Sequence, residues 1–488
     1  MDEQLQYRIN TISRLSIRLN SLVWWASPIA SKNRFYQPFN DVFDEKKVQF
    51  IKLIPIYLYK LVRLIISTIV KCSYARFVKS NCNPSKVSKD ILIIKSFLYP
   101  TQSLDNYVDS FFGDLPKYLP ENFEVVYLLE PVNCHKLALS KSNQNIVSIF
   151  KIINPTDILW ILYHLIANFF RIYKETFDDD LDRRIFHIHL LDHINPTTFF
   201  AMLYYTAGLR LGKWPHARTL LYTFENNPWE KMLLAGINKS AKHIKKIGYQ
   251  HNVIPLASSN MFFGDEELSL SPKPDKILTT GPITANILKK YSAFNNQNIP
   301  TCALRYKDLY QLTPVVNKSK NLLIALEGVL QASSFLNHFG KQLDQLVDWN
   351  IIIRCHPALP FNQLKKSVTI NFEKYSNVKI SINKSLFEDL NSSFVVMYWG
   401  STVGLEALML SKPVINIQFT ETNYDPLFEL HSLKKTWVPS SPLILLLDYF
   451  YNMDPAIFNN EYNSARKYII NYLSPCTDEN MTKFVSAL

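Results

Sequence analysis

Apolar and polar positions alternate along the chain in two regular series, the first of which begins at residue 90. Short apolar runs bounded by polar turns are typical of strands buried in a parallel sheet, and the amphipathic stretches between them are typical of covering helices. In the first series we predict strands at residues 91–94, 124–129, 185–190, 219–224, 244–249 and 276–279, and a helix near residues 107–119. This alternation predicts a parallel sheet with helices on its faces.

The pattern relaxes between residues 295 and 320, where two prolines and a polar Asn-Lys-Ser-Lys run favour a domain boundary. A second series then predicts strands at residues 322–326, 351–354, 378–382, 394–398 and 414–417, with a helix near residues 335–346. Together the two series predict an α/β protein of two Rossmann-like domains facing across a cleft, which is the GT-B architecture. Ligands of such open sheets bind beyond the carboxyl ends of the strands, so we expect the functional residues there.

These patterns divide the chain into four segments. A helical, basic N-terminal extension covers residues 1–89, a first Rossmann-like domain covers 90–312 and a second covers 313–455. C-terminal helices at residues 456–488 are predicted to pack back toward the first domain. The extension contains an apolar stretch, residues 51–70, that Lys52, Lys60 and Arg63 interrupt. Such a stretch is typical of a helix lying on an anionic membrane surface, and equally of an amphipathic helix on the protein's own core. A second apolar stretch, residues 158–170, is too short to span a bilayer and is predicted to be a core helix.

The charge balance narrows the range of partners. With 53 Lys and Arg residues against 41 Asp and Glu, the formal net charge is +12, which favours an anionic partner such as phospholipid or a phosphorylated substrate. Nucleic acid is not expected, because the sequence has neither zinc-ligand spacing nor a dense Arg/Lys helix. The six cysteines are scattered, and the N-terminus lacks the layout of a signal peptide. We therefore expect reduced thiols and a cytoplasmic location.

The segment from residue 394 to 416 reads as a strand, a tight turn at Gly400, a short helix and a second strand. Ser401 and Thr402 stand where the helix is expected to begin, and the unpaired N–H groups at a helix start bind phosphate. Ser401 is alternatively the helix cap, and a capping hydroxyl can also be recruited by a ligand. Because the turn follows the carboxyl end of a strand, we predict an anion site here.

A second predicted strand ends in an arginine and a histidine. In residues 349–357 an apolar strand brings Arg354 and His356 to its carboxyl end, where Pro357 turns the chain. An imidazole in this position can donate to a phosphate or protonate a departing one, although a histidine at a strand end is often structural. Glu327 and Gly328 open the second series and are predicted to approach the same ligand, since Gly328 permits close backbone contact.

The first series offers a carboxylate. Glu225 follows an apolar strand and precedes a helix start formed by Asn227, Pro228 and Glu230, in which Glu230 is predicted to be structural. Glu225 is predicted to face the cleft as nucleophile or general base, the alternative being a solvated loop carboxylate.

The neighbouring strand end supplies further polar side chains to the same edge. We predict that the cleft beside Glu225 is lined by Asn226, Tyr249, Gln250 and His251.

These motifs resemble those of bacterial surface-polysaccharide glycosyltransferases of the GT-B type that use CMP-activated acidic sugars. His356-Pro357 is similar to the His-Pro motif of that family, and residues 400–414, GSTVGLEALMLSKPV, are similar to the serine/threonine motif of capsule Kdo transferases and bacterial sialyltransferases. Residues 223–230, TFENNPWE, together with residues 247–251, IGYQH, look like a subgroup associated with retaining β-Kdo transfer. The resemblance covers residues 90–417. It departs from the family pattern at Arg354-Cys355, where relatives commonly have a lysine and another residue, so the cation is displaced by one position or supplied differently.

The resemblance implies that Glu225 and His356 are catalytic and that the donor is held in the second domain, by Glu327, Gly328, Arg354, His356, Pro357, Gly400, Ser401 and Thr402. It implies retaining transfer of Kdo from CMP-Kdo to a lipid-linked surface glycan such as lipopolysaccharide, O-antigen or capsule. The first domain would then hold the acceptor, and the enzyme would lie on the inner face of the cytoplasmic membrane.

No cofactor or metal is expected, because a CMP-sugar carries a single phosphate and needs no cation to bridge a diphosphate. No Asp-x-Asp triplet stands at a predicted strand end, and the run at residues 178–180 is predicted to be a solvated linker. Three alternatives stay open: a transferase using CMP-sialic acid or a UDP- or GDP-sugar, a polyol-phosphate transferase, and a non-catalytic scaffold of a polysaccharide assembly complex.

Overall fold

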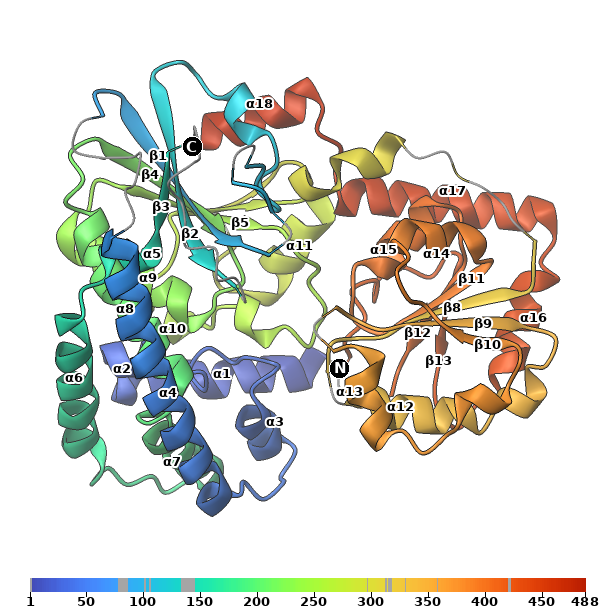
Figure 1. Ribbon diagram of the computed structural model, residues 1–488, viewed down its shortest axis with the longest axis horizontal. Helices are drawn as coiled ribbons and strands as arrows, with labels where there is room; N and C mark the ends of the chain where they lie inside the picture. The colour runs from blue at the N-terminus through green and yellow to red at the C-terminus, as the bar shows by residue number, and fades with distance from the viewer. Residues whose placement is uncertain are drawn as a thin grey trace. The chain divides into compact units, whose positions relative to one another are not determined.

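The computed structural model describes most of the chain, at residues 2–77, 87–100, 102–104, 107–132, 145–295, 297–311, 314, 318–329, 331–357, 359–419 and 423–488. Cys82, Cys134 and the predicted boundary between residues 312 and 313 lie outside these residues. The chain divides into two compact units (Figure 1). Unit 1 comprises Met1–His251, Ser258–Arg305 and Cys476–Leu488, and unit 2 comprises Asn252–Ala257 and Tyr306–Pro475.

Unit 1 is built on a seven-stranded parallel sheet of order β3-β2-β1-β4-β5-β6-β7. Its strands are β1 (Asp90–Leu98), β2 (Phe123–Pro131), β3 (Ile146–Ser148), β4 (Ala217–Thr223), β5 (Lys245–Gln250), β6 (Lys276–Thr279) and β7 (Asn298–Pro300). The apolar runs form strands because both faces are covered, as the complete burial of residues 91–94 in β1 illustrates. Five of the six predicted strands of this series are confirmed.

The helices of unit 1 include the N-terminal region and one C-terminal helix: α1 (Asp2–Leu19), α2 (Leu22–Ala26), α3 (Gln37–Phe43), α4 (Phe50–Phe77), α5 (Ile149–Ile152), α6 (Thr156–Ile172), α7 (Asp180–Asp192), α8 (Pro196–Leu211), α9 (Pro228–Ser240), α10 (Asp265–Leu270), α11 (Pro282–Tyr291) and α18 (Asp478–Ala487). The N-terminal helices are part of this unit: Trp24 of α2 is fully buried against His189 of α7.

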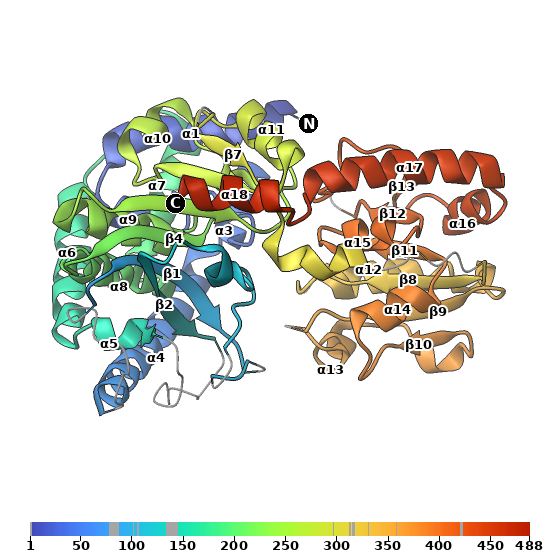
Figure 2. The same ribbon diagram turned by 90° about the horizontal axis from the view of Figure 1, so that it is seen from above.

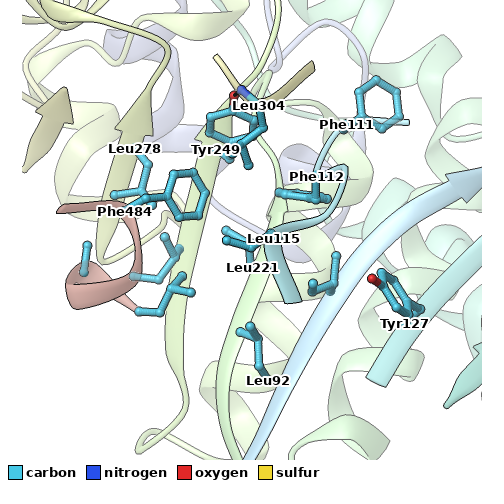
Figure 3. Close-up of a cluster of buried hydrophobic side chains, with 14 of the residues drawn as sticks. Leu92, Phe111, Phe112, Leu115, Tyr127, Leu221, Tyr249, Leu278, Leu304 and Phe484 are labelled. Atoms are coloured by element: carbon cyan, nitrogen blue, oxygen red, sulfur yellow. Dashed lines mark hydrogen bonds between the residues drawn. The ribbon is translucent and has the colours of Figure 1, made fainter. Parts of the chain in front are cut away.

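A hydrophobic cluster fills the space between the sheet of unit 1 and α18 (Figure 3). Leu92, Leu221 and Leu278 contribute from three strands, and Phe484 contributes from α18. Tyr249 of β5 belongs to this cluster, and its ring lies edge-on to Phe484.

Two predicted elements of the first series are wrong. The strand expected at residues 185–190 lies within helix α7, because Asp179 caps the helix by accepting the N–H of Asp182. The run IFHIHL alternates as a strand would, yet both histidines lie on a helix and His189 is buried with Ile185 and Ile188.

The helix expected near residues 107–119 is mostly irregular. It contains only a short 3-10 turn, Leu115–Tyr118. The Asp109 carboxylate accepts the N–H groups of Phe111 and Phe112, and Gly113 adopts a φ of 52°, so the chain turns here before a helix can form.

Unit 2 is built on a six-stranded parallel sheet of order β10-β9-β8-β11-β12-β13. Its strands are β8 (Asn321–Ala325), β9 (Asn350–Arg354), β10 (Val378–Ile380), β11 (Val395–Tyr398), β12 (Val414–Ile417) and β13 (Lys434–Trp437). Its helices are α12 (Gln331–Gly340), α13 (Phe361–Leu364), α14 (Leu386–Ser392), α15 (Val403–Met409), α16 (Leu443–Tyr451) and α17 (Pro455–Tyr472).

All five strands predicted in the second series are present, and β13 was not predicted. Two Rossmann-like parallel sheets and a helical N-terminal region confirm the predicted fold class. The cleft between the domains stays a prediction.

Candidate functional site

Three strand ends of unit 2 lie side by side. Strand β8 is paired with β9 on one side and with β11 on the other, and all three run in parallel. The residues that follow them therefore meet at one edge of the sheet: His356 after β9, Glu327 and Gly328 after β8, and Gly400 after β11.

Two glycines allow these residues to touch. A Cβ atom on Gly328 would lie 2.8 Å from Nδ1 and 3.1 Å from Cγ of His356, so the imidazole rests directly on the Gly328 backbone. A Cβ atom on Gly400 would lie 2.9 Å from Oε1 of Glu327 and 3.0 Å from the carbonyl oxygen of Tyr424. His356, Gly328, Glu327 and Gly400 thus form one continuous row of contacts, and the structure brings together the two strand ends that the sequence analysis singled out.

This edge is open to solvent in part. Gly328, His356 and Pro357 are exposed, Glu327 is half-buried and Gly400 is buried. An imidazole and a carboxylate at the same sheet edge offer a hydrogen-bond donor and an acceptor, a combination that binds phosphate through one group and hydroxyls through the other.

The start of helix α15 differs in detail from the prediction. Thr402 rather than Ser401 occupies the N-cap position, and its hydroxyl donates to Oε1 of Glu406 at 3.0 Å instead of capping the backbone. Ser401 precedes the cap and is half-buried. The helix lies close to β11 because a Cβ atom on Gly404 would be 2.9 Å from the Tyr398 ring.

Arg354 is engaged away from the His356 edge. Its guanidinium donates to the buried Asp389 carboxylate at 2.7 Å and to the carbonyl oxygen of Lys384 at 3.0 Å. Strand β9 pairs with β10 on this side, and Ser381 just beyond β10 also contacts the guanidinium, at 3.4 Å. The cation predicted to bind the donor is therefore already paired with an anion.

In unit 1, Glu225 is held by a dense network just after β4. The Glu230 carboxylate, from the first turn of α9, accepts the N–H of Glu225 at 3.1 Å and the N–H of Asn226 at 2.8 Å. Asn226 adopts a φ of 57°, a left-handed conformation that an asparagine tolerates at a cost.

Asn226 and Asn260 hold this turn from the other side. Nδ2 of Asn226 donates to the carbonyl oxygen of Asn260 at 2.8 Å, and Nδ2 of Asn260 donates to the carbonyl oxygen of Glu225 at 2.6 Å. The Glu225 side chain is only half-buried: Asn227 donates to its Oε2 at 3.1 Å, and His251 Nε2 lies 3.8 Å from its Oε1. The backbone is thus fixed while the carboxylate stays accessible, which suits a reacting group.

The predicted neighbours of Glu225 separate into two groups. His251 and Asn226 lie against Glu225, and His251 is buried with its ring on Phe111. Burial lowers the pKa of His251, and the Glu225 carboxylate opposes only part of that shift. The side chains of Gln250 and Tyr249 bond to other parts of unit 1 instead.

Gln250 is buried and accepts the N–H of Thr280 at 3.1 Å. Tyr249 lies in the core cluster, where its hydroxyl donates to the carbonyl oxygen of Cys302 and accepts the N–H of Leu304, both at 3.0 Å. Both side chains are buried and bonded inside unit 1, so they do not line the surface that a ligand would contact.

Sequence reasoning missed a buried lysine next to this network. Lys95 of β1 is fully buried, 3.6 Å from the Glu130 carboxylate, with its ammonium 3.9 Å from the centre of the Phe97 ring and 4.6 Å from that of Trp229. Burial lowers the pKa of Lys95 to about 8. The sequence did contain a sign of it, a lysine within the apolar strand DILIIKSFL. A charged side chain in such a buried run needs an ion-pair or hydrogen-bond partner.

Glu230 makes stability depend on pH. Burial, and next the neighbouring Glu225 carboxylate, raise the pKa of Glu230 to about 8, well above the usual value of about 4.3. Since the folded state keeps this proton and the unfolded state loses it, the contribution of Glu230 is complete at low pH and is lost as pH rises toward 8. The Glu230→Gln side chain stays neutral at every pH. We therefore expect the free energy of unfolding of the variant, relative to that of wild type, to rise by about 2 kcal/mol from pH 5.5 to pH 7.5.

The measurement is the free energy of unfolding by urea at both pH values. The exposed Glu121→Gln serves as control and should follow wild type. Equal pH dependence in wild type and Glu230→Gln would show that Glu230 is ionised in the folded protein.

No protein-family model matches the sequence, and no curated protein matches it either. Among solved structures, the chain is similar to a glycosyltransferase from Rickettsia africae at 12% identity and a TM-score of 0.47, covering 82% of this chain and 98% of that one. It is also similar to MurG from Acinetobacter baumannii, at 12% identity and a TM-score of 0.42 over 82% and 98% of the two chains. A UDP-GlcNAc 2-epimerase from Neisseria meningitidis gives 10% identity and a TM-score of 0.48 over 81% and 99%. Similarity this distant does not place the chain in a family.

Proposed function

We propose that the chain is a glycosyltransferase that holds the nucleotide of an activated sugar at the His356–Gly400 edge of unit 2. The observation that carries this proposal is the continuous row of contacts through His356, Gly328, Glu327 and Gly400 at three adjacent strand ends. In this assignment the His356 imidazole donates a hydrogen bond to the phosphate of the activated sugar, and the Glu327 carboxylate accepts hydrogen bonds from hydroxyl groups of the ribose or the sugar. Ser401 and Thr402 stand beside the phosphate.

Glu225 is the reactive carboxylate in the proposal. Its backbone is fixed by Glu230 and Asn260 while its side chain stays accessible. Because burial lowers the pKa of His251, the Glu225 carboxylate faces a neutral imidazole near pH 7. A carboxylate so placed can attack the anomeric carbon, form a glycosyl–enzyme ester with release of the nucleotide, and pass the sugar to an acceptor hydroxyl with net retention.

The proposed donor is CMP-Kdo, on the strength of the His-Pro and Gly-Ser-Thr motifs, and the proposed acceptor is a lipid-linked bacterial surface glycan. The proposed place of reaction is the cytoplasmic face of the inner membrane. We further propose that no metal takes part in the transfer.

The test is nucleotide release from a panel of CMP-Kdo, CMP-sialic acid and UDP- and GDP-sugars, with a surface-glycan extract as acceptor. We expect CMP release from CMP-Kdo that persists in excess chelator. Release of UDP or GDP alone would refute the donor assignment, and complete loss of turnover in chelator would refute metal independence. No turnover with any donor would point to a scaffold.

A further inference from the structure

Two helices of unit 1 each expose an apolar stripe. On α4, the residues at every fourth position from 54 to 70 form one side of the helix, and Ile54, Leu58, Val62, Ile66 and Val70 are 42–60% exposed. From Leu61 onward another side of α4 is buried, through Leu61, Thr68, Cys72 and Ala75, whereas residues 51–60 are half-buried or exposed all round. The helix is therefore docked on unit 1 by one side only.

Helix α6 repeats this arrangement. Leu159, Tyr163, Ile166 and Phe170 follow helical spacing along one side and are 57–71% exposed. Its other side is buried through residues such as Ile161 and Leu165, so the prediction of a core helix holds for only half of its surface. Exposed apolar stripes of this length mark surfaces that meet something less polar than water.

The two helices are neighbours on the outside of unit 1. Both pack on α8, and Arg76 near the end of α4 donates to Asn154, which precedes α6, at 2.7 Å. Figure 1 shows α6 at the left margin of this unit and α4 crossing its front, and in Figure 2 both helices lie at the outer edge of the unit.

The charges beside the α4 stripe are all of one sign. Residues 46–77 contain no Asp or Glu and seven basic residues: Lys46, Lys47, Lys52, Lys60, Arg63, Lys71 and Arg76. Lys52, Lys60 and Arg63 are exposed on the side adjoining the stripe. Lysine is depleted at the centre of protein–protein interfaces, whereas lysine, arginine and tyrosine beside aliphatic residues are typical of helices at the surface of an anionic bilayer.

We propose that the α4 and α6 stripes dock unit 1 on an anionic lipid surface, with both helices lying in the plane of the interface. By length and composition, residues Phe50–Arg76 would also suffice to cross a bilayer. Lys60 and Arg63 stand near the middle of α4, and its buried side is bound to unit 1, so an interfacial position satisfies both features. The surface would bring the enzyme to the lipid-linked acceptor of the proposed function, but the docking itself is independent of turnover.

The experiment is flotation of the purified full-length protein with vesicles of phosphatidylcholine, with or without phosphatidylglycerol. We expect binding to the anionic vesicles that weakens in high salt. The pairs Leu58→Ser/Ile66→Ser and Tyr163→Ser/Ile166→Ser should each lower the bound fraction about tenfold or more. Lys60→Gln/Arg63→Gln should abolish the preference for phosphatidylglycerol.

The matched control is Val347→Ser/Leu445→Ser in unit 2, which replaces two residues that are 68% and 63% exposed and should float as wild type. Wild type that fails to float, or stripe variants that float normally, would overturn the proposal. A wild-type dimer that the stripe substitutions dissociate would show that a second copy covers the stripes. Resistance of the bound protein to alkaline carbonate would show that α4 spans the bilayer. Nucleotide release toward a soluble acceptor would be unaffected by any of these results.

Discussion

Replacing Glu225 by Gln should lower turnover about a thousandfold while leaving the affinity for CMP unchanged. The amide keeps the size of the carboxylate and can still bond to Asn227, so the turn that Glu230 and Asn260 hold should persist. What disappears is the nucleophilic oxygen, and only a role in the transition state predicts loss of kcat without loss of nucleotide binding. The measurement pairs steady-state CMP release with calorimetric titration of CMP.

Glu121→Gln is the control for the loss of one carboxylate from unit 1, because Glu121 is exposed, and it should retain full activity. Near-normal turnover in Glu225→Gln would remove Glu225 from the chemistry. Loss of CMP affinity together with turnover would indicate a collapsed fold, which the thermal unfolding midpoint would reveal.

The second large effect concerns the contact between Gly328 and His356. His356→Ala should lower kcat/KM about a hundredfold, since a donor to the phosphate is removed. Gly328→Ala should reproduce most of this loss with His356 intact, because the added methyl group would lie 2.8 Å from the imidazole and must displace it. Both residues are exposed, so stability should change little.

A double-mutant cycle separates this mechanism from general damage. When the imidazole is absent, the methyl group that Gly328→Ala adds meets no ring, so the double variant should be no worse than His356→Ala alone. Additive losses would mean that Gly328 acts through its own backbone, and unaltered kcat/KM in both single variants would exclude the edge as the donor site.

Most strands were predictable because each is a short apolar run that needs burial on both faces. The failures have local causes. The run at residues 185–190 satisfies strand alternation and helix burial at once, and only the cap at Asp179 decides between them. Near residue 110, a side chain that binds the backbone, Asp109, outweighs the apolar pattern.

The candidate site was predictable where it depends on strand ends, since parallel topology alone places His356, Gly328 and Gly400 together. It was not predictable where a side chain has a partner distant in sequence. Asp389 pairs with Arg354 across 35 positions, and Cys302, 53 positions on, accepts the Tyr249 hydroxyl in the core. Sequence identifies the residue type at a strand end, but the partner decides whether that residue is available to a ligand.

A crystal structure of the full chain with CMP would test most directly whether the His356–Gly400 edge holds the nucleotide. We expect a phosphate oxygen within hydrogen-bond distance of the His356 imidazole and a ribose hydroxyl donating to Glu327, at the edge between β9 and β11. CMP bound at any other place, or this edge empty at saturating CMP, would contradict it.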